Sequence, residues 1–147
     1  MAPPKTYRAD EVTVDFGPKR ISGYAEDEFV SIADSTPRAS KLVGADGEVV
    51  VSQHADLSGE VTVTVLTTSD ANDVFQDALD RNQRGPGMAF VALSIRDLNG
   101  RAKHLFPHCW VQEAPTVVYG RSGRSHAWKL GYAKRAPGGI RGSAAAT

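Results

Sequence analysis

The sequence has few of the features that mark membrane, secreted or disulfide-stabilised proteins. Cys109 is the only cysteine among 147 residues, so no internal disulfide can form, and a single thiol suits assembly in a reducing cytoplasm. No apolar run reaches the roughly 18 residues of a membrane-spanning helix. Residues 1–5 have no apolar stretch behind a basic head, so we expect no signal peptide and no membrane partner.

Motifs of common enzyme and cofactor sites are also missing. The chain contains no nucleophile elbow, Walker loop, dinucleotide fingerprint or His-Glu-x-x-His motif. His104, His108 and Cys109 suggest a metal site, but in a strand the two histidines share one face and Cys109 takes the other. A third ligand would have to come from elsewhere, with His126 as the candidate. We therefore expect no metal, no cofactor and no catalytic activity, with Cys109 a small buried apolar residue.

Three other patterns have both a functional and a structural interpretation. The acids of residues 26–28 could bind calcium, but they lack the spacing of a dedicated loop, which favours a solvated turn. Trp110 and Trp128 could stack on nucleic-acid bases or pack in a core. Residues 120–124 suggest a phosphate cradle, but no strand–helix context surrounds them. The structural interpretation is favoured in each case.

Charge is balanced over the whole chain but is unevenly distributed. Residues 1–100 hold 16 of the 17 acids and 9 of the 17 bases. Residues 101–147 hold one acid, Glu113, and eight bases. This asymmetry has two interpretations. One is a chance distribution of the charges over solvated faces, and the other is electrostatic complementarity between copies of the chain. A protein that binds free nucleic acid is usually basic overall, which this chain is not.

Short strands dominate the predicted structure. Strict alternation indicates a strand over residues 11–16, and β-branched residues favour another over residues 60–66. Further strands are expected at residues 29–33, 90–96, 103–110, 117–119 and 126–133. Asn99-Gly100 is expected to turn one hairpin, because this dipeptide readily adopts positive φ angles.

One helix is predicted to interrupt the strands. Thr68 or Ser69 can cap its start, and residues 85–87, Gly-Pro-Gly, end it. Its apolar residues recur at the spacing of a single buried stripe, which consists of Ala71, Val74, Phe75, Ala78 and Leu79. The helix is short and one-sided, so we expect it to lie across a sheet.

Residues 35–59 show little core-facing pattern. Polar and charged residues surround one apolar piece at residues 49–51, and Asp46-Gly47 could turn a hairpin. A segment of about 25 residues is long for a simple connection, and such segments in compact domains are usually functional. We expect a long extended loop.

The order and spacing of short motifs resemble the tail tube proteins of tailed bacteriophages. These motifs are residues 32–35, 44–48, 58–63, Leu66, 68–69, Gln112, 115–117, Tyr119, Trp128 and Gly131. The resemblance covers roughly residues 10–139. It implies a mainly β fold, a tail-tube-like β-sandwich or barrel with one flanking α-helix and a long extended loop. It also implies one domain, with a core over about residues 7–136 and a flexible tail at residues 137–147.

The resemblance further implies a structural subunit of a phage inner tail tube. Six copies would form a ring, and rings would stack head to tail around a lumen that conducts DNA without binding it specifically. The implied partners are other copies of the chain and the tail sheath, baseplate and tail terminator proteins. The place would be the tail of the virion, of a contractile type, after assembly in the host cytoplasm. Two alternatives remain, a tube subunit of a phage-tail-like injection device and a monomeric β-barrel module that binds nucleic acid.

Two groups of residues are the candidate functional residues of such a tube. Strand alternation turns valines toward the core and the acids Glu11, Asp15 and Glu60 toward the lumen, where negative charge repels phosphate. Residues 35–59 are expected to reach the adjacent ring. The expected ring-stacking residues are Arg38, Lys41, Asp46, Glu48, Val50 and Asp56.

Overall fold

A computed structural model describes residues 3–4, 6–85, 90–98 and 102–140. Its elements are a 3-10 turn η1 (Ala9–Glu11), the strands β1 (Val12–Phe16), β2 (Lys19–Ile21), β3 (Val30–Asp34), β4 (Ala39–Val43), β5 (Val49–Gln53) and β6 (Gly59–Leu66), the helix α1 (Ala71–Arg84), and the strands β7 (Val91–Asp97), β8 (Lys103–Glu113) and β9 (Ser125–Tyr132). The predicted Asn99-Gly100 turn, residues 86–87 and the tail beyond residue 140 lie outside the described residues.

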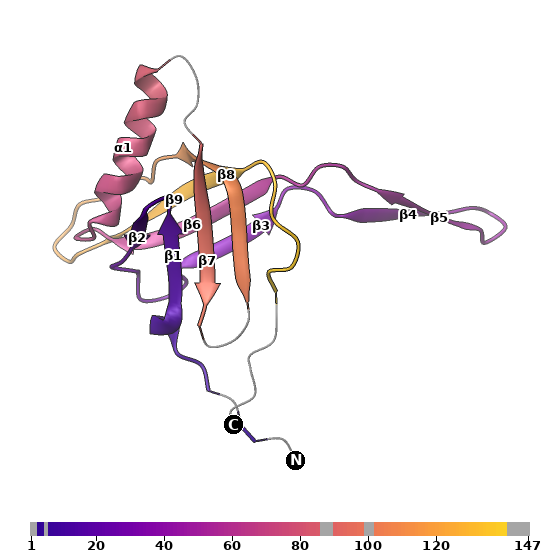
Figure 1. Cartoon of the computed structure of the whole chain (residues 1–147), viewed down its shortest axis with the longest axis horizontal. Coiled ribbons are helices and arrows are strands. Elements are labelled where there is room, and N and C mark those ends of the chain that lie inside the picture. Colours follow the sequence, from indigo (N-terminus) through magenta and orange to yellow (C-terminus); the bar gives the residue numbers. More distant parts are fainter. Residues whose placement is uncertain (1–2, 5, 86–89, 99–101, 141–147) are drawn as a thin grey trace.

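Seven antiparallel strands form the body of the molecule, in the order β2-β1-β7-β8-β9-β6-β3. Strands β4 and β5 form a separate two-stranded sheet that projects from the body as a long arm (Figure 1). The expected mainly β fold with one flanking helix is confirmed. Within the described ranges the edge strands β2 and β3 do not pair with each other, so the sheet does not close into a barrel.

The core lies on one face of this curved sheet. The alternation of side chains along each strand places the core on this face. In strand β6, for example, Gly59, Val61, Val63 and Val65 are buried and alternate with more exposed residues. Helix α1 adds the predicted stripe, with Phe75 fully buried. The largest fully buried side chains are Tyr132, Phe75, Phe106, Ile21, Leu93 and Leu130.

Asn72 fastens helix α1 to the sheet. Its Oδ1 atom accepts a hydrogen bond from Trp128 Nε1 at 3.0 Å and contacts His126 Nδ1 at 3.0 Å. Its Nδ2 atom donates to the carbonyls of Leu66 and Ser69, each at 3.0 Å. Ser69 also supports the helix start, because its Oγ accepts a hydrogen bond from the backbone amide of Ala71. Trp128 is thus a core residue with a satisfied indole.

One expected strand is wrong. Residues 114–124, between β8 and β9, form no strand, although residues 117–119 are β-branched and aromatic. Val117, Val118 and Tyr119 are 55%, 50% and 87% exposed, so no core face exists for them to pack on. Pro115 also cannot donate to a ladder.

The expected long loop is a regular β-hairpin. Leu42 pairs with Val50 and Val43 with Val49 across the turn. Asp46-Gly47 lies in that turn, as the dipeptide indicated, with Gly47 at φ +90°. Asp46 Oδ1 accepts a hydrogen bond from the amide of Glu48 at 3.1 Å. The strands escaped prediction because neither face of the arm is buried, so no alternation marks them.

A set of hydrogen bonds holds together the root of the arm. Asp56 accepts hydrogen bonds from the amide and the hydroxyl of Ser58, at 3.0 and 2.5 Å, and from Thr36 Oγ1 at 2.6 Å. The amide of Ser35 donates to the carbonyl of Ser58. These bonds hold the pKa of Asp56 at about 2. Asp34, at the end of β3, accepts a hydrogen bond from the Tyr132 hydroxyl at 2.5 Å. The arm is therefore attached to the body through side chains as well as through the backbone.

The start of the expected flexible tail lies along β8. The amide of Ala136 donates to the carbonyl of Leu105 at 2.9 Å, and the amide of Lys103 donates to the carbonyl of Gly139 at 3.2 Å. Residues 136–139 are thus hydrogen-bonded to the body.

The substitution Asn72→Ala is expected to lower the free energy of unfolding by about 1–3 kcal/mol, because the buried indole N–H of Trp128 loses its acceptor. Urea denaturation followed by Trp fluorescence measures this. The matched control is Gln76→Ala on the exposed side of the same helix, which is expected to change stability by less than about 0.5 kcal/mol. Equal effects of the two substitutions would contradict this role of Asn72.

The Asp56 carboxylate is expected to titrate near pH 2 in the folded protein, below its ordinary value of 3.8, because its hydrogen bonds favour the charged form. Since the folded pKa is depressed, its contribution to the arm root is complete above about pH 4 and is lost as the pH falls through about 2. NMR titration of the carboxyl carbon measures this. In the Thr36→Ala/Ser58→Ala variant the midpoint should rise toward 3.8, and an unchanged midpoint would refute the assignment.

Candidate functional site

The arm is the most distinctive surface of the molecule. Every residue of β4 and β5 is exposed, including the large apolar residues Leu42 (71%), Val43 (55%), Val49 (54%), Val50 (52%) and Val51 (63%). Leu42 and Val50 share one face, whereas Val43 and Val49 share the other. A two-stranded ribbon with two bare apolar faces is marginal in water by itself. An exposed apolar surface of this kind is typical of an interaction site.

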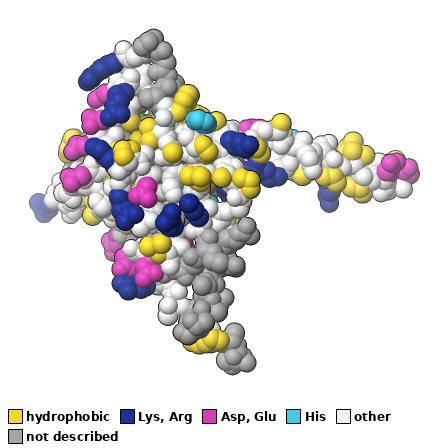
Figure 2. Space-filling view, in the orientation of Figure 1, with side chains coloured by type: hydrophobic (Ala, Val, Ile, Leu, Met, Phe, Trp, Pro, Cys, Tyr) yellow, Lys and Arg dark blue, Asp and Glu magenta, His cyan; other side chains and the backbone are white. Residues whose placement is uncertain are grey.

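The six predicted ring-stacking residues are spread along the whole arm. Asp46 and Glu48 lie at its tip, where Figure 2 shows a group of acidic side chains, and Lys41 and Val50 lie on its strands. Because Lys41 pairs with Val51, Lys41 and Val50 point to opposite faces.

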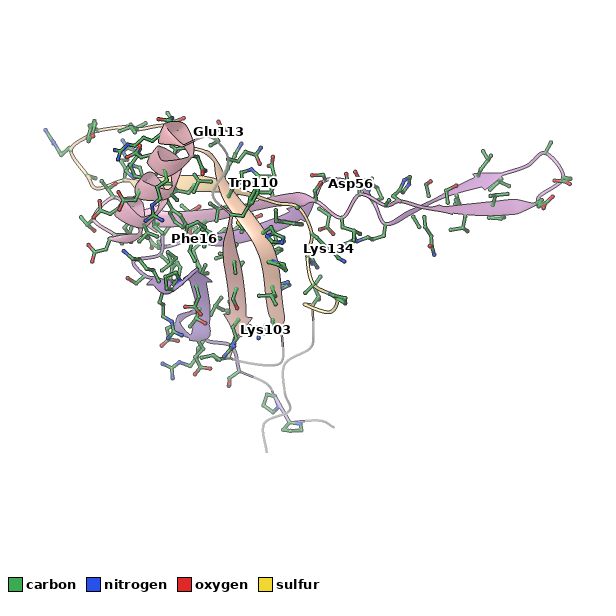
Figure 3. The ribbon with its side chains drawn as sticks, turned by 45° about the horizontal axis from the view of Figure 1, so that its top comes forward. Phe16, Asp56, Lys103, Trp110, Glu113 and Lys134 are labelled. Atoms are coloured by element: carbon green, nitrogen blue, oxygen red, sulfur yellow. The ribbon has the colours of Figure 1, made fainter. Side chains whose placement is uncertain are left out.

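The other two predicted stacking residues lie at the arm root. Arg38 approaches Asp34 at 4.0 Å, and Asp56 holds the hydrogen bonds already described (Figure 3). Both therefore make contacts within the chain.

Sequence reasoning missed Leu42 and Val43 as part of this surface. Their signal was present, because an Asp46-Gly47 turn pairs them with Val50 and Val49. Only the register of the hairpin reveals that the apolar piece at residues 49–51 has a counterpart on β4.

The three predicted lumen residues do not come together within one subunit. Asp15 lies on β1 and Glu60 on β6, with β7, β8 and β9 between these two strands. Both point to the face of the sheet opposite the core, which we call the outer sheet face. Asp15 is paired with Arg20 at 3.1 Å, and Glu60 accepts a hydrogen bond from Gln112 at 3.0 Å.

Glu11 is the third predicted lumen residue. It ends the turn η1 and lies outside the strands, with its carboxylate 3.8 Å from Arg8. The outer sheet face also carries cations, since Arg96 pairs with Thr13 in the strand register and Lys129 lies 3.6 Å from Glu113. The face within one subunit is therefore mixed in charge.

The expectation that His104 and His108 share a face is wrong. The register of β7 and β8 shifts between Val91 and Leu93, so that Phe106 and Cys109 both face the core and His108 points outward. This bulge inserts an extra residue and reverses the alternation beyond it. His104 stays on the core side, where burial, with Arg135 nearby, lowers its pKa. Burial raises the pKa of Cys109 to about 12.

Neither a metal site nor a membrane-spanning helix is found in the part of the chain that the structure describes. There, no group of three or more His, Cys, Asp or Glu side chains could hold a metal ion. No helix in that same part is long and apolar enough to span a membrane. The three acids of residues 26–28 are exposed in the loop before β3.

Solved structures with a similar fold come from contractile injection systems. A chain from the sheath–tube complex of the extracellular contractile injection system PVC in its extended state superposes with a TM-score of 0.63, at 10% identity over 89% of this chain and 90% of that one. A chain from the PVC sheath/tube terminator gives a TM-score of 0.63, at 11% identity over 92% and 98%. A chain from the tube-terminating cap of the anti-feeding prophage gives 0.60, at 7% identity over 92% and 93%. These similarities show a shared fold.

Sequence comparisons agree with the resemblance drawn from the motifs. The protein named "Structural protein ORF10" from Pseudomonas phage KPP10 is 24% identical over 133 residues, which cover 85% of this chain and 76% of that protein. The family model of the bacteriophage PhiTE tail tube protein matches residues 12–134, from β1 to just beyond β9. The chain therefore belongs to the bacteriophage PhiTE tail tube protein family.

Proposed function

We propose that this chain is the repeating subunit of the inner tube of a contractile phage tail, in which six copies form each ring and rings stack head to tail. The observation that carries this proposal is the arm, whose two faces expose five large apolar residues. None of the residues that the structure describes covers either face. A partner that covers them in every subunit of a homopolymer is another copy of the same chain.

The sheet supports the ring part of the proposal. Its edge strands β2 and β3 are not paired with each other within the described ranges, and exposed edges invite pairing with another chain. Closing such edges around a ring would protect them, whereas a head-to-tail contact through the arm does not close and generates a filament. The two features thus supply the two kinds of interface that a tube requires.

The lumen part rests on the outer sheet face. Glu60, Thr62 and Thr64 alternate with buried valines along β6, so this strand presents a wet, polar surface. With Asp15 and Glu11, Glu60 would line a channel that DNA crosses without specific binding, since these carboxylates would oppose phosphate contacts beside the cations Arg96 and Lys129 of the same face. Tail sheath, baseplate and tail terminator proteins would meet the outside and the ends of the tube, in a virion tail assembled in the host cytoplasm.

A second candidate is the tube of a contractile injection device. The fold shared with chains from PVC and from the anti-feeding prophage favours this alternative. Both candidates place the same ring contacts and the same arm in a tube, and they differ in the cargo that passes through the lumen.

Replacement of residues 38–56 by a short Gly-Ser turn is expected to leave a folded, soluble subunit, because β4 and β5 contribute nothing to the buried core. This subunit is expected to stop at monomers or single rings. Circular dichroism checks the fold, and negative-stain microscopy checks the assembly. A second variant, Leu42→Ser/Val50→Ser, keeps the length of the arm but removes one apolar face. It should also impair stacking. Long regular tubes from the shortened protein would contradict the stacking role.

Replacement of Glu11, Asp15 and Glu60 by Lys is expected to permit tube assembly but to slow DNA ejection, because each Lys adds a phosphate contact. The readout is the rate of DNA release from particles that carry the variant tube. The matched control changes Asp73, Asp77 and Asp80 of helix α1 to Lys, with the same change in charge on another surface. Normal ejection from the lumen variant, or equal slowing in both variants, would contradict the placement of these acids in the lumen.

A further inference from the structure

A second apolar surface lies on the outer sheet face. Phe90, His108, Trp110 and Ala133 line a shallow hollow, which we call the aromatic patch. The Phe90 ring meets Trp110 edge-on at 5.8 Å and 72°, and meets His108 at 6.1 Å and 74°. Phe90 keeps 56% of its surface exposed, whereas Trp110 is half-buried. The patch is thus formed but left uncovered by the described part of the chain.

The local structure holds Trp110 flat against the sheet. Trp110 pairs with Gly131 of β9, and a Cβ atom at Gly131 would lie only 2.8 Å from the indole ring. The missing side chain at Gly131 therefore lets the ring lie across the neighbouring strand. The β8 bulge adds His108 to the same face. The glycine at position 131 and the β8 bulge thus create this surface together.

The aromatic patch lies close to the root of the arm. Ala133 directly follows Tyr132, which pairs with Gly59 at the start of β6 and whose hydroxyl donates to Asp34 at the end of β3. The arm leaves the body from these two strands (Figure 1). Leu42 is eight residues beyond Asp34, which corresponds to roughly 26 Å of extended chain. The arm of a given copy therefore carries its own apolar residues away from its own patch.

The arm and the aromatic patch are complementary in chemistry. Leu42 and Val50 form an apolar pair on one arm face, of a size to lie on two aromatic rings. The arm tip is acidic through Asp46 and Glu48, whereas Lys134 follows directly after Ala133 of the patch (Figure 3). This pairing uses the charge asymmetry between the acidic first part of the chain and its basic last part.

We propose that the aromatic patch of one copy receives the arm of a second copy, with Leu42 and Val50 against Phe90 and Trp110. The proposal rests on the proposed tube function and names the surface that the arm contacts. The patch shares the outer sheet face with Glu60, because Trp110 pairs with Gly131 and Gly131 pairs with Glu60, so the docked arm lies at the end of the lumen, where one ring meets the next. Each copy gives one arm and receives one, so the contact is heterologous and repeats without closing. Successive copies are then offset by roughly the 26 Å from arm root to Leu42.

Cross-linking tests the contact directly. The variant Leu42→Cys/Phe90→Cys, treated with a short bismaleimide after assembly, is expected to give a ladder of covalent multimers on a denaturing gel. The native Cys109 is fully buried and does not compete for the reagent. The control Leu42→Cys/Tyr119→Cys uses another exposed aromatic residue, 87% exposed in the β8–β9 loop, and it is expected to stay monomeric on the gel. A ladder from the control but not from the Phe90 variant would overturn the proposal.

An assembly measurement supplies a second readout. Phe90→Ser is expected to raise the critical concentration for tube assembly by about tenfold or more, as for a residue central to an interface. The matched control is Leu98→Ser, because both side chains are 56% exposed, and its critical concentration is expected to stay within about twofold. Circular dichroism confirms that both variants are folded.

The outcomes separate this inference from the proposed function. If the wild-type protein builds tubes while the Phe90 pair gives no ladder and both Ser variants assemble alike, the docking surface is wrong and the tube function stands. If the wild-type protein stays monomeric at all concentrations, the tube function is wrong and the docking surface falls with it.

Discussion

The proposed assembly depends on one uncovered surface, the two apolar faces of the arm. Folding normally hides large aliphatic side chains, yet Leu42 and Val51 are 71% and 63% exposed. Full burial of such residues stabilises by about 1.5–3 kcal/mol each, and within the described chain the arm gains only part of this by folding alone. The missing stabilisation becomes available only when a second chain covers the ribbon. In the proposed tube, assembly supplies the stabilisation that the arm lacks in a single subunit.

The body can support such an arm because its own core is complete without it. Buried residues of β1, β6, β7, β8 and β9 pack with Phe75 of helix α1, and Asn72 satisfies the indole of Trp128. The arm joins this body at a root where Asp56 accepts three hydrogen bonds and Asp34 accepts one from Tyr132. These hydrogen bonds restrain the root, and a restrained segment loses less entropy when a partner orders it. The body therefore provides the core on which folding depends, whereas the arm provides the surface for the proposed assembly.

Residue patterns alone predict the parts of the fold that have a buried face. Strict alternation identified β6, and helical spacing identified α1, because burial enforces those periods. The arm was expected to be a loop since no burial acts on it, and residues 117–119 were expected to be a strand although nothing covers them. The position of His108 depended on a β-bulge that propensity does not encode. The aromatic patch was likewise invisible, because it requires Gly131 to lie opposite Trp110 across two strands.

The family relationship and the exposed arm thus support the same proposal, a tail tube subunit whose arm is covered by neighbouring copies. Cryo-electron microscopy of filaments assembled from the purified full-length protein tests this claim most directly. We expect sixfold rings in which Leu42, Val43 and Val49 to Val51 of each arm are buried against other copies. Filaments in which these side chains remain open to solvent, or a protein that forms no filaments at high concentration, would contradict the account.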